Sequence, residues 1–418
     1  MICLKSTFRM NPNTNAQDKR QFTARALPVH LYSGDGALSR LPSELSRFGA
    51  HRAVIICGRS VHSKTGLIRH MEQMLGARFA GVFAELAEGA PSECIERAAA
   101  FARELACDAL IAVGAGSVLK GTRVVAMLMG EGRPLPEMAT RYGPDGKPAS
   151  TRLLQPKVPI FNVLTAPTTA QNRGGSALRM SGSLHQLEFF DPKTRPKAIF
   201  WDPVALATAP ASLISSAGLE VFFFALMGLG SAPQSNVLVA PSRVQAWNLA
   251  STAMMQLDDL NSRLDLCAAA YLQNRDEDDG GQPLKTHLAA RAAYALSVAL
   301  FNRCEGLTQS HGYAAFSGAS VRKLGRLCNA AMSEIGTHLG VASVQHDNEY
   351  LDLVASAIDD AFVRLGWPVK LPARSVMAAG VDELVGFAIR NYNANSDGAL
   401  TPHANLLKEV LLESLAAS

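Results

Sequence analysis

Glu220 is the one acidic residue in a long apolar stretch, and an isolated acid of this kind can take part in chemistry. Residues 215–231 read SSAGLEVFFFALMGLGS, which predicts an apolar helix with Glu220 in its first turn. Burying a carboxylate is costly unless it is paired, hydrogen-bonded or protonated. We therefore expect Glu220 either to have a partner or to be a partly exposed acid that the positive end of the helix dipole favours.

A glycine-rich turn could bind phosphate. The stretch VGAGSVLKGTR, residues 113–123, places Gly114, Gly116 and Ser117 between a predicted strand and a predicted helix. Glycines there let backbone N–H groups approach an anion, and the helix N-terminus adds partial positive charge. A tight turn without a ligand has the same pattern. Its place at the carboxyl end of a parallel strand, where open α/β sheets bind ligands, favours the phosphate site.

Two other polar turns follow predicted strands. APTTAQNRGGSA, residues 166–177, offers the hydroxyl groups of Thr168 and Thr169. CGRS, residues 57–60, would add Gly58, Arg59 and Ser60 if it lies beside them. Three nearby cationic side chains could supplement anion binding: Lys120, Arg123 and Arg173. Turns that converge at one edge of a sheet predict a nucleotide site.

Short β-branched runs alternate with amphipathic stretches in the first half of the chain. The β-like runs occupy residues 53–58, 77–83, 108–116, 160–167 and 198–203, and the helix-like stretches occupy residues 66–75 and 92–106. This order predicts an α/β domain of parallel βαβ units with right-handed crossovers. A polar insertion rich in Gly and Pro, residues 130–159, is expected to form a loop near the strand ends.

The second half of the chain is rich in Ala and Leu with helical periodicity, which predicts a helical domain. We divide the chain into an N-terminal extension (1–26), an α/β dinucleotide-binding domain (27–203) and a helical domain (204–418). The acidic stretch QNRDEDDGGQP, residues 273–283, is expected to be an exposed loop between helices.

Composition excludes several classes of protein. The 418 residues are 48% hydrophobic and 18% charged, and a net charge of +4 is too weak to indicate nucleic acid or a membrane surface as the partner. The seven cysteines are scattered and form no C-x-x-C pair, which argues for free thiols in a reducing compartment. No apolar signal core and no apolar run of about eighteen residues occurs. We therefore expect a cytoplasmic protein.

The order of several short landmarks resembles the iron-containing alcohol dehydrogenase family, which includes maleylacetate reductases and glycerol-type dehydrogenases. The landmarks are YSGDGALSRLPSEL, IICGRS, GAGSVLKGTR, APTTA, FWDPVALATAPASLISSAGLE, SHG and LGWPVKLPARSVMAAGVDELVGFAIRNYNAN. The resemblance implies a Rossmann-like N-terminal domain followed by a helical, dehydroquinate-synthase-like C-terminal domain. It also implies NAD or NADP in the cleft between the two domains.

The resemblance further implies a metal, usually iron or zinc, that one Asp and three His hold and that polarises the alcohol oxygen. This chain departs from that pattern. Glu220 stands at the Asp, Phe224 at one His, and Tyr294 and Val298 at a His pair, while His311 of SHG matches a ligand position. A stable site normally needs at least three protein ligands. We therefore expect no iron or zinc; if any metal binds, Glu220 and His311 would hold it.

The cofactor turn also departs from the family pattern. Lys120 stands at a family Asp and Arg123 at a family Lys, so positive charge is kept beside the expected pyrophosphate. Gly58 stands where many NAD-preferring members have an acid that holds the adenosine ribose. Because Arg59 follows it and no acid repels a phosphate, NADP should be tolerated as well as NAD.

Two functions stay open. The first is an NAD(P)-dependent oxidoreductase that transfers hydride between nicotinamide and a small alcohol or carbonyl, without a metal and as a homodimer. His311 would be a general acid, Tyr294 a proton donor, and Glu220 a protonated group hydrogen-bonded to one of them. The second is a catalytically inactive relative that keeps nucleotide binding as a sensor or partner subunit. In that case Tyr294 would be a core aromatic residue and His311 a turn histidine.

Overall fold

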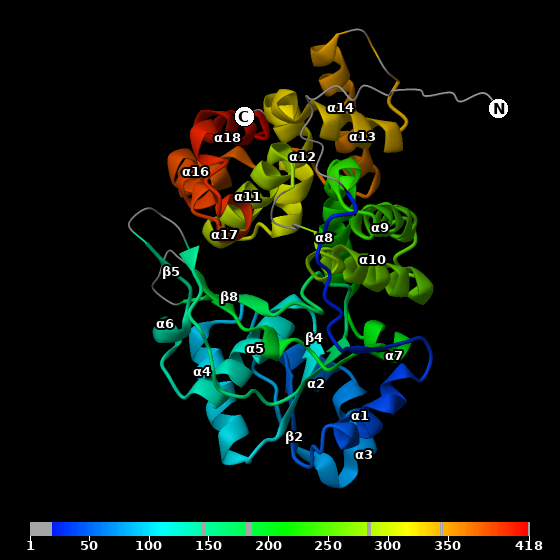
Figure 1. Cartoon of the computed structure of the whole chain (residues 1–418), viewed down its shortest axis with the longest axis vertical. Helices are drawn as coiled ribbons and strands as arrows, with labels where there is room; N and C mark the ends of the chain where they lie inside the picture. Colours follow the sequence, from blue (N-terminus) through cyan, green and yellow to red (C-terminus); the bar gives the residue numbers. More distant parts are fainter. Residues whose placement is uncertain are drawn as a thin grey trace, which may run out of the picture.

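The computed structural model describes residues 19–143, 148–180, 186–281, 286–342, 344 and 346–416. It has an α/β half and a helical half, which lie at opposite ends of the molecule in Figure 1. Residues 1–18 of the expected N-terminal extension lie outside the described residues. Further along, the backbone N–H of Arg25 donates a 2.6 Å hydrogen bond to the carbonyl of Asp278 in the helical half.

Six parallel strands form the main sheet, in the spatial order β1-β10-β7-β4-β2-β3. They are β1 (His30–Ser33), β2 (Ala53–Cys57), β3 (Phe79–Phe83), β4 (Ala109–Gly114), β7 (Ile160–Leu164) and β10 (Ala198–Trp201). The adjacent strands β2, β4 and β7 are buried along their whole length, as parallel strands with both faces covered should be. The predicted parallel α/β architecture is therefore confirmed.

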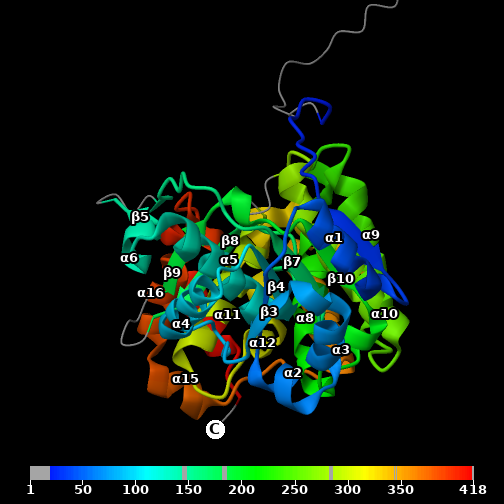
Figure 2. The same cartoon turned by 90° about the horizontal axis from the view of Figure 1, so that it is seen from below.

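Helices cover both faces of this sheet. α1 (Leu41–Arg47) and α3 (Leu67–Leu75) pack on one face, against Ile55 and Ile111. α4 (Ser92–Glu104) and α5 (Gly116–Glu131) pack on the other face, against Ile56 and Leu110. Because successive side chains of a strand point to opposite faces, each apolar strand contributes side chains to two cores, one on each face of the sheet. Figure 2 shows the strands between these layers. The short helix α2 (Arg59–Lys64) follows β2.

The segment between β4 and β10 holds structure that the sequence did not predict. The expected loop, 130–159, begins inside α5 and contains α6 (Leu135–Met138) and the antiparallel pair β5 (Arg141–Tyr142) and β6 (Pro148–Ala149). A second antiparallel pair, β8 (Gly175–Arg179) and β9 (Gln186–Phe190), follows β7. Ser176 fastens this pair to α5 by donating a 2.9 Å hydrogen bond to the carbonyl of Lys120.

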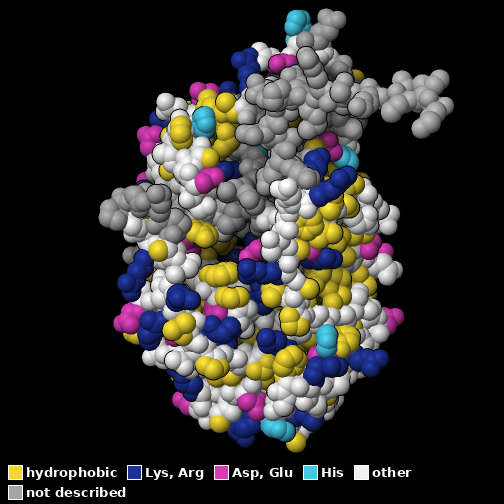
Figure 3. Space-filling model, in the orientation of Figure 1, with side chains coloured by type: hydrophobic (Ala, Val, Ile, Leu, Met, Phe, Trp, Pro, Cys, Tyr) yellow, Lys and Arg dark blue, Asp and Glu magenta, His cyan; other side chains and the backbone are white. Residues whose placement is uncertain are grey.

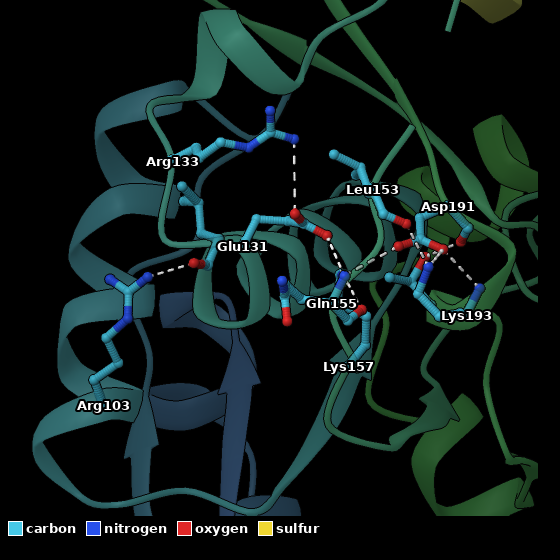
Figure 4. Close-up of polar contacts among 10 residues, drawn as sticks. Arg103, Glu131, Arg133, Leu153, Gln155, Lys157, Asp191 and Lys193 are labelled. Atoms are coloured by element: carbon cyan, nitrogen blue, oxygen red, sulfur yellow. Dashed lines mark hydrogen bonds and ion pairs between the residues drawn. The ribbon is translucent and has the colours of Figure 1, made fainter. Parts of the chain in front are cut away.

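A buried ion-pair network, drawn in Figure 4, holds this segment against the sheet. The side chain of Lys157 has no exposed surface, and its Nζ lies 2.8 Å from Oε1 of Glu131 and 3.3 Å from Oδ2 of Asp191. Lys193 adds a 3.0 Å contact to Oδ1 of Asp191. The network therefore joins the end of α5, the approach to β7 and the turn after β9.

The described elements from Pro203 onward are all helical, which confirms the predicted helical half. They are α7 (Pro203–Leu206), α8 (Ala211–Leu229), α9 (Val239–Ala253), α10 (Leu260–Asp278), α11 (Leu288–Arg303), α12 (Gln309–Leu324), α13 (Asn329–His338), α14 (Asp347–Arg364), α15 (Ala373–Ala379), α16 (Val381–Ile389), α17 (Tyr392–Asn395) and α18 (Ala404–Glu413), with short 3-10 turns between some of them. The division into domains 27–203 and 204–418 stays a prediction.

α8 is largely buried in the core of this half. Its side chains share one core with those of α9, α11 and α12. Among the described residues it is the one helix long and apolar enough for a membrane span, and 56% of that stretch is buried inside the protein. On the face shown in Figure 3, hydrophobic side chains gather over α9 and α10, and Lys and Arg side chains are spread over the α/β half.

The acidic stretch 273–283 is not the exposed loop that was predicted. α10 continues through it to Asp278, and the side chains of Asn274 and Asp276 are buried. Residues 282–283 of the stretch lie outside the described residues. Asp276 is paired with Arg243 of α9 at 2.6 Å, so helix packing explains an acid that composition alone assigned to a solvated surface.

Candidate functional site

A cleft of about 1500 Å³ lies between the two halves, at the carboxyl ends of the strands. The turns after β2, β4 and β7 line it on one side, and α8, α11 and α12 line it on the other. All nine predicted cofactor-binding residues line this cleft: Gly58, Arg59, Ser60, Gly114, Gly116, Ser117, Lys120, Thr168 and Thr169. Glu220 and Tyr294 line it too, whereas His311 is absent from the described residues of its wall.

The turn between β4 and α5 brings backbone close to the cleft. A Cβ on Gly114 would lie 2.6 Å from Cγ2 of Val118, so the turn closes this tightly only with glycine. Gly116 begins α5, and a Cβ there would have Oγ1 of Thr168 as its nearest neighbour, at 3.4 Å. The first turn of a sixteen-residue helix therefore meets the cleft, an arrangement that suits phosphate.

Backbone groups position the hydroxyl side chains of these turns. Oγ of Ser117 accepts a 3.1 Å hydrogen bond from the N–H of Gly89, which joins the β4–α5 turn to the loop after β3. Oγ1 of Thr168 accepts a 3.1 Å bond from the N–H of Ala170. Both hydroxyl groups keep their own hydrogen for a ligand.

Arg123 supports the turn after β7 from inside. Its side chain is 2% exposed. Nη1 donates to the carbonyls of Ala170 and Arg173, each at 2.7 Å, and Nε donates to Oγ of Ser176 at 3.1 Å. These N–H groups are therefore used within the protein, and Arg123 supplements an anion mainly through its charge rather than by direct contact.

Lys120 and Glu220 are neighbouring charges in the cleft. Burial lowers the pKa of Lys120, and the Glu220 carboxylate acts in the opposite direction. Arg123 and Arg173 lower that pKa further. The Lys120 side chain runs back along α5, since its Cε would lie 3.7 Å from a Cβ on Gly116. Its ammonium group thus lies in the same region as the turn between β4 and α5.

Glu220 lies in the middle of α8 and not in its first turn, because the helix begins at Ala211. The prediction of a helix-start acid is therefore wrong. The hypothesis about its partner is also wrong: Oγ1 of Thr169 donates a 2.5 Å hydrogen bond to Oε1 of Glu220, in place of Tyr294 or His311. The turn after β7 thus supplies the partner that a partly buried acid requires.

Tyr294 lies on α11 and lines the cleft. Nδ2 of Asn393 donates a 3.1 Å hydrogen bond to its phenolic oxygen, which leaves the phenolic hydrogen available to another acceptor. Burial raises the pKa of Tyr294, so the phenol is neutral at pH 7. Its ring also packs against Phe224, with the ring centroids 5.7 Å apart. Tyr294 therefore combines a core contact with a polar tip in the cleft.

His311 is a capping residue at the start of α12. Its Nδ1 accepts a 3.1 Å hydrogen bond from the N–H of Thr308 and lies 2.8 Å from the Thr308 hydroxyl. Its ring packs edge-on against Trp367, with centroids 5.1 Å apart. Burial lowers its pKa. Of the two alternatives for His311, a general acid and a turn histidine, this geometry agrees with the turn histidine.

The side chains at the ligand positions implied by the resemblance do not form a metal site. Phe224 offers no donor atom, and Oε1 of Glu220 and Nδ1 of His311 already have Thr169 and Thr308 as hydrogen-bond partners. Within the described part of the chain, no three His, Cys, Asp or Glu side chains are grouped so that they could hold a metal ion. The donor set therefore does not fit iron or zinc. A metal-free activity stays a prediction.

A smaller cavity of about 90 Å³ lies next to the cleft, between Arg173 of the α/β half and side chains of the helical half; we call it the inner cavity. Four residues line both spaces: Arg173, Phe224, Tyr294 and Asn393. Asn393 is absent from the predicted site because α17 is a short helix that only tertiary packing brings to α11.

Two further residues of this region, Asn274 and Asp276, were missed because they lie in the acidic stretch. They are 7% and 5% exposed. One signal could have found Asn274: it follows Leu266 and Ala270 at intervals of four, so it continues the apolar face of α10. An amide at such a position suggests a buried hydrogen-bond network.

Comparisons with known proteins agree with this arrangement. Residues 28–203 match the family model of the iron-containing alcohol dehydrogenases. A 4-hydroxybutyrate dehydrogenase of Cupriavidus necator is 25% identical over 245 residues, which are 58% of this chain and 63% of that protein. Maleylacetate reductase 2 of Cupriavidus pinatubonensis is 25% identical over 261 residues, which are 61% and 63% of the two chains. The chain thus matches just under two thirds of the length of these relatives.

Solved structures share the fold over nearly the whole chain. NADH-dependent butanol dehydrogenase A of Thermotoga maritima superposes with a TM-score of 0.77 at 16% identity, over 95% of this chain and 99% of that one. The maleylacetate reductase of Rhizobium sp. does so with a TM-score of 0.69 at 16% identity, over 94% and 98%. The family match of the α/β half, the two relatives and the shared fold support placing the chain in the iron-containing alcohol dehydrogenase family.

Proposed function

We propose that this protein is an NAD(P)-dependent oxidoreductase that transfers hydride between nicotinamide and a small alcohol or carbonyl compound. The observation that carries the proposal is that one cleft is lined both by the three strand-end turns and by Glu220 and Tyr294. Phosphate-binding turns and proton-donating groups are the two parts that such a reaction needs in one place.

The three turns would bind the dinucleotide. The backbone at Gly114 and Gly116 would hold the pyrophosphate at the start of α5, and Lys120 would add positive charge beside it. Gly58 and Arg59 would face the adenosine ribose after β2. Because Gly58 has no acidic side chain, we expect NADPH to bind as well as NADH.

Tyr294 would protonate the substrate during reduction. Hydride from the reduced nicotinamide would add to the carbonyl carbon, and the phenol would donate its proton to the oxygen that becomes the alcohol. The hydrogen bond from Asn393 makes the phenolic oxygen an acceptor there, so its own hydrogen would point to the substrate. Glu220 and Thr169 would keep Lys120 and the turn after β7 in place.

The names of relatives agree with small substrates of this type. One is named for 4-hydroxybutyrate, several for maleylacetate, and one is a probable NADH-dependent butanol dehydrogenase. Each of these names refers to a short alcohol, hydroxy acid or keto acid. We propose only that the substrate of this protein belongs to the same class of compounds.

Titration of the purified protein with NADH and NADPH, followed by nucleotide fluorescence, tests the proposal. We expect both to bind with Kd well below about 1 mM. A panel of short aldehydes should then oxidise NADH or NADPH, with loss of absorbance at the reduced nicotinamide band. Failure of both nucleotides to bind would refute the oxidoreductase. Binding without turnover of any aldehyde or keto acid would favour the inactive relative.

Metal content and assembly need separate measurements. We expect activity to persist after prolonged dialysis against a chelator, and stoichiometric iron or zinc in the purified protein would contradict this. We also propose a homodimer in the cytoplasm, with no nucleic acid or membrane as partner. Sedimentation analysis should give a mass close to twice the 44.5 kDa of one chain.

A further inference from the structure

Arg173 lies where the cleft meets the inner cavity. Its side chain lines both spaces, together with Phe224, Tyr294 and Asn393. If a small molecule accepts a hydrogen bond from the Tyr294 phenol, its remaining atoms would therefore lie next to the guanidinium group of Arg173. The position of Arg173 therefore indicates which chemical group the substrate carries in addition to its carbonyl or alcohol group.

Buried hydrogen bonds hold Arg173 in place. Its Nε donates a 2.8 Å bond to Oδ1 of Asn274. Nδ2 of Asn274 in turn donates 2.6 Å bonds to the carbonyl of Thr169 and to Oδ1 of Asn172. The backbone carbonyl of Arg173 accepts the 2.7 Å bond from Arg123. A side chain anchored at Nε loses little entropy when its terminal N–H groups bind a ligand.

The charge of Arg173 has no close partner among the described residues, since no carboxylate lies within ion-pair distance of it. The other two guanidinium groups on the inner cavity are paired. Arg243 contacts Oδ2 of Asp276 at 2.9 and 2.6 Å, and Arg291 pairs with Asp397. These two pairs are close to neutral. On the cleft side, the cations Lys120, Arg123 and Arg173 outnumber the one acid that acts on Lys120, Glu220, so the charge near Arg173 is positive. A partly buried cation of this kind favours an anionic ligand.

We propose that the substrate carries a carboxylate and that Arg173 binds it, while the carbonyl or alcohol group of the same molecule lies at Tyr294. This inference rests on the proposed function and specifies its substrate class. A guanidinium group presents two parallel N–H donors to a carboxylate, so it selects this group over a neutral chain end.

The inner cavity also limits the size of the molecule. Its volume of about 90 Å³ leaves room for only a few atoms beyond the junction. The substrate is therefore a short oxo or hydroxy acid rather than a long-chain alcohol.

The test compares two aldehydes of four carbons, succinic semialdehyde and butyraldehyde, which differ in the carboxylate. We expect kcat/KM of the wild-type protein to be higher for succinic semialdehyde. Arg173→Met should lower kcat/KM for succinic semialdehyde by about 30-fold or more. It should lower kcat/KM for butyraldehyde much less, because that aldehyde has no carboxylate. Arg173→Lys should keep part of the preference, because it keeps charge without the second donor.

Arg69→Met is the matched control, since Arg69 is an exposed residue of α3 outside the cleft and the inner cavity. It removes the same charge and should keep the wild-type ratio. NADH affinity and far-ultraviolet circular dichroism check that each variant is folded. If Arg173→Met does not fold, Arg173→Lys and Arg173→Gln supply the comparison.

Several results would overturn the inference without touching the proposed function. One is equal kcat/KM for the two aldehydes in the wild-type protein. Another is an Arg173→Met variant that loses NADH affinity while its ratio of kcat/KM values is unchanged, because Arg173 would then bind the cofactor.

If NADH binds but neither aldehyde reacts, succinate should still raise the melting temperature of the NADH complex of the wild-type protein but not of Arg173→Met. No such rise would refute the carboxylate site, whereas loss of NADH binding by the wild-type protein would refute the proposed function.

Discussion

Tyr294 is the residue whose contacts match a proton donor best. Its phenol is kept neutral because burial raises its pKa, and Asn393 already supplies a donor to its oxygen. We predict that Tyr294→Phe lowers kcat by about 100-fold or more while NADH affinity is kept. Stopped-flow or steady-state kinetics with the preferred aldehyde would measure this. Tyr350→Phe, which changes a tyrosine of α14 outside the cleft, is the control; equal rates for the two variants would remove Tyr294 from the mechanism.

His311 should matter for stability more than for turnover. Its Nδ1 caps the start of α12 through Thr308, and its ring packs on Trp367. We predict that His311→Ala lowers the free energy of unfolding by about 1 kcal/mol, which is the usual effect of losing a cap. Urea unfolding measures this. A loss of kcat as large as that of Tyr294→Phe, with unchanged stability, would restore His311 as a catalytic residue.

At the scale of elements, the network around Lys157 joins α5, β7 and the turn after β9. Lys157→Met would leave the buried carboxylates of Glu131 and Asp191 without their shared cation. We predict a loss of about 3 kcal/mol in the free energy of unfolding, since breaking a buried pair strands the remaining charges. Lys408→Met is the control, because Lys408 pairs with the exposed Asp382 and such pairs contribute about 1 kcal/mol at most. Similar losses in the two variants would contradict the role given to the network.

The contact between β1 and α1 should make stability depend on pH. Burial raises the pKa of Glu44, but hydrogen bonds from Tyr32 (2.7 Å) and His30 (3.0 Å) lower it more, so the folded pKa lies below the ordinary 4.5. The carboxylate therefore contributes stability above the unfolded pKa and loses it as pH falls through the folded pKa. We predict that the loss of stability below about pH 5 is smaller in Glu44→Gln than in the wild-type protein. Urea titrations at several pH values measure this, and parallel curves would contradict it.

At the scale of the whole molecule, a ligand in the cleft touches both halves and should stabilise them together. NADH at a hundred times its Kd should add about 2.7 kcal/mol to the free energy of unfolding. Gly116→Asp should abolish this gain, because it puts a negative charge at the start of α5 while a Cβ there has room. Gly386→Asp on α16, where a Cβ also has room, is the control. Thermal unfolding of each variant with and without NADH measures the gain. An equal gain in both variants would indicate that the nucleotide binds elsewhere.

The parallel sheet, the helical second half and the polar turns at the strand ends could all be predicted from the sequence. These features depend on local patterns: apolar runs of strand length, glycines between strand and helix, and helical periodicity. The same patterns gave a wrong prediction for the end of α10. Its polar residues resemble those of a solvated loop, and their buried partners cannot be recognised from the local sequence. Arg243 for Asp276 and Thr169 for Asn274 are such partners, and both lie on other elements.

The pairs of side chains that lie together in the cleft could be identified only after the chain had been seen folded. Thr169 and Glu220 are 51 residues apart, Tyr294 and Asn393 are 99 apart, and Arg173 and Asn274 are 101 apart. No periodicity links such positions, because each pair joins elements that are far apart in the sequence and meet only through tertiary packing. The same reason separates His311 from the site that its motif suggested. Local patterns therefore place the wall of the cleft, and packing assigns the partners within it.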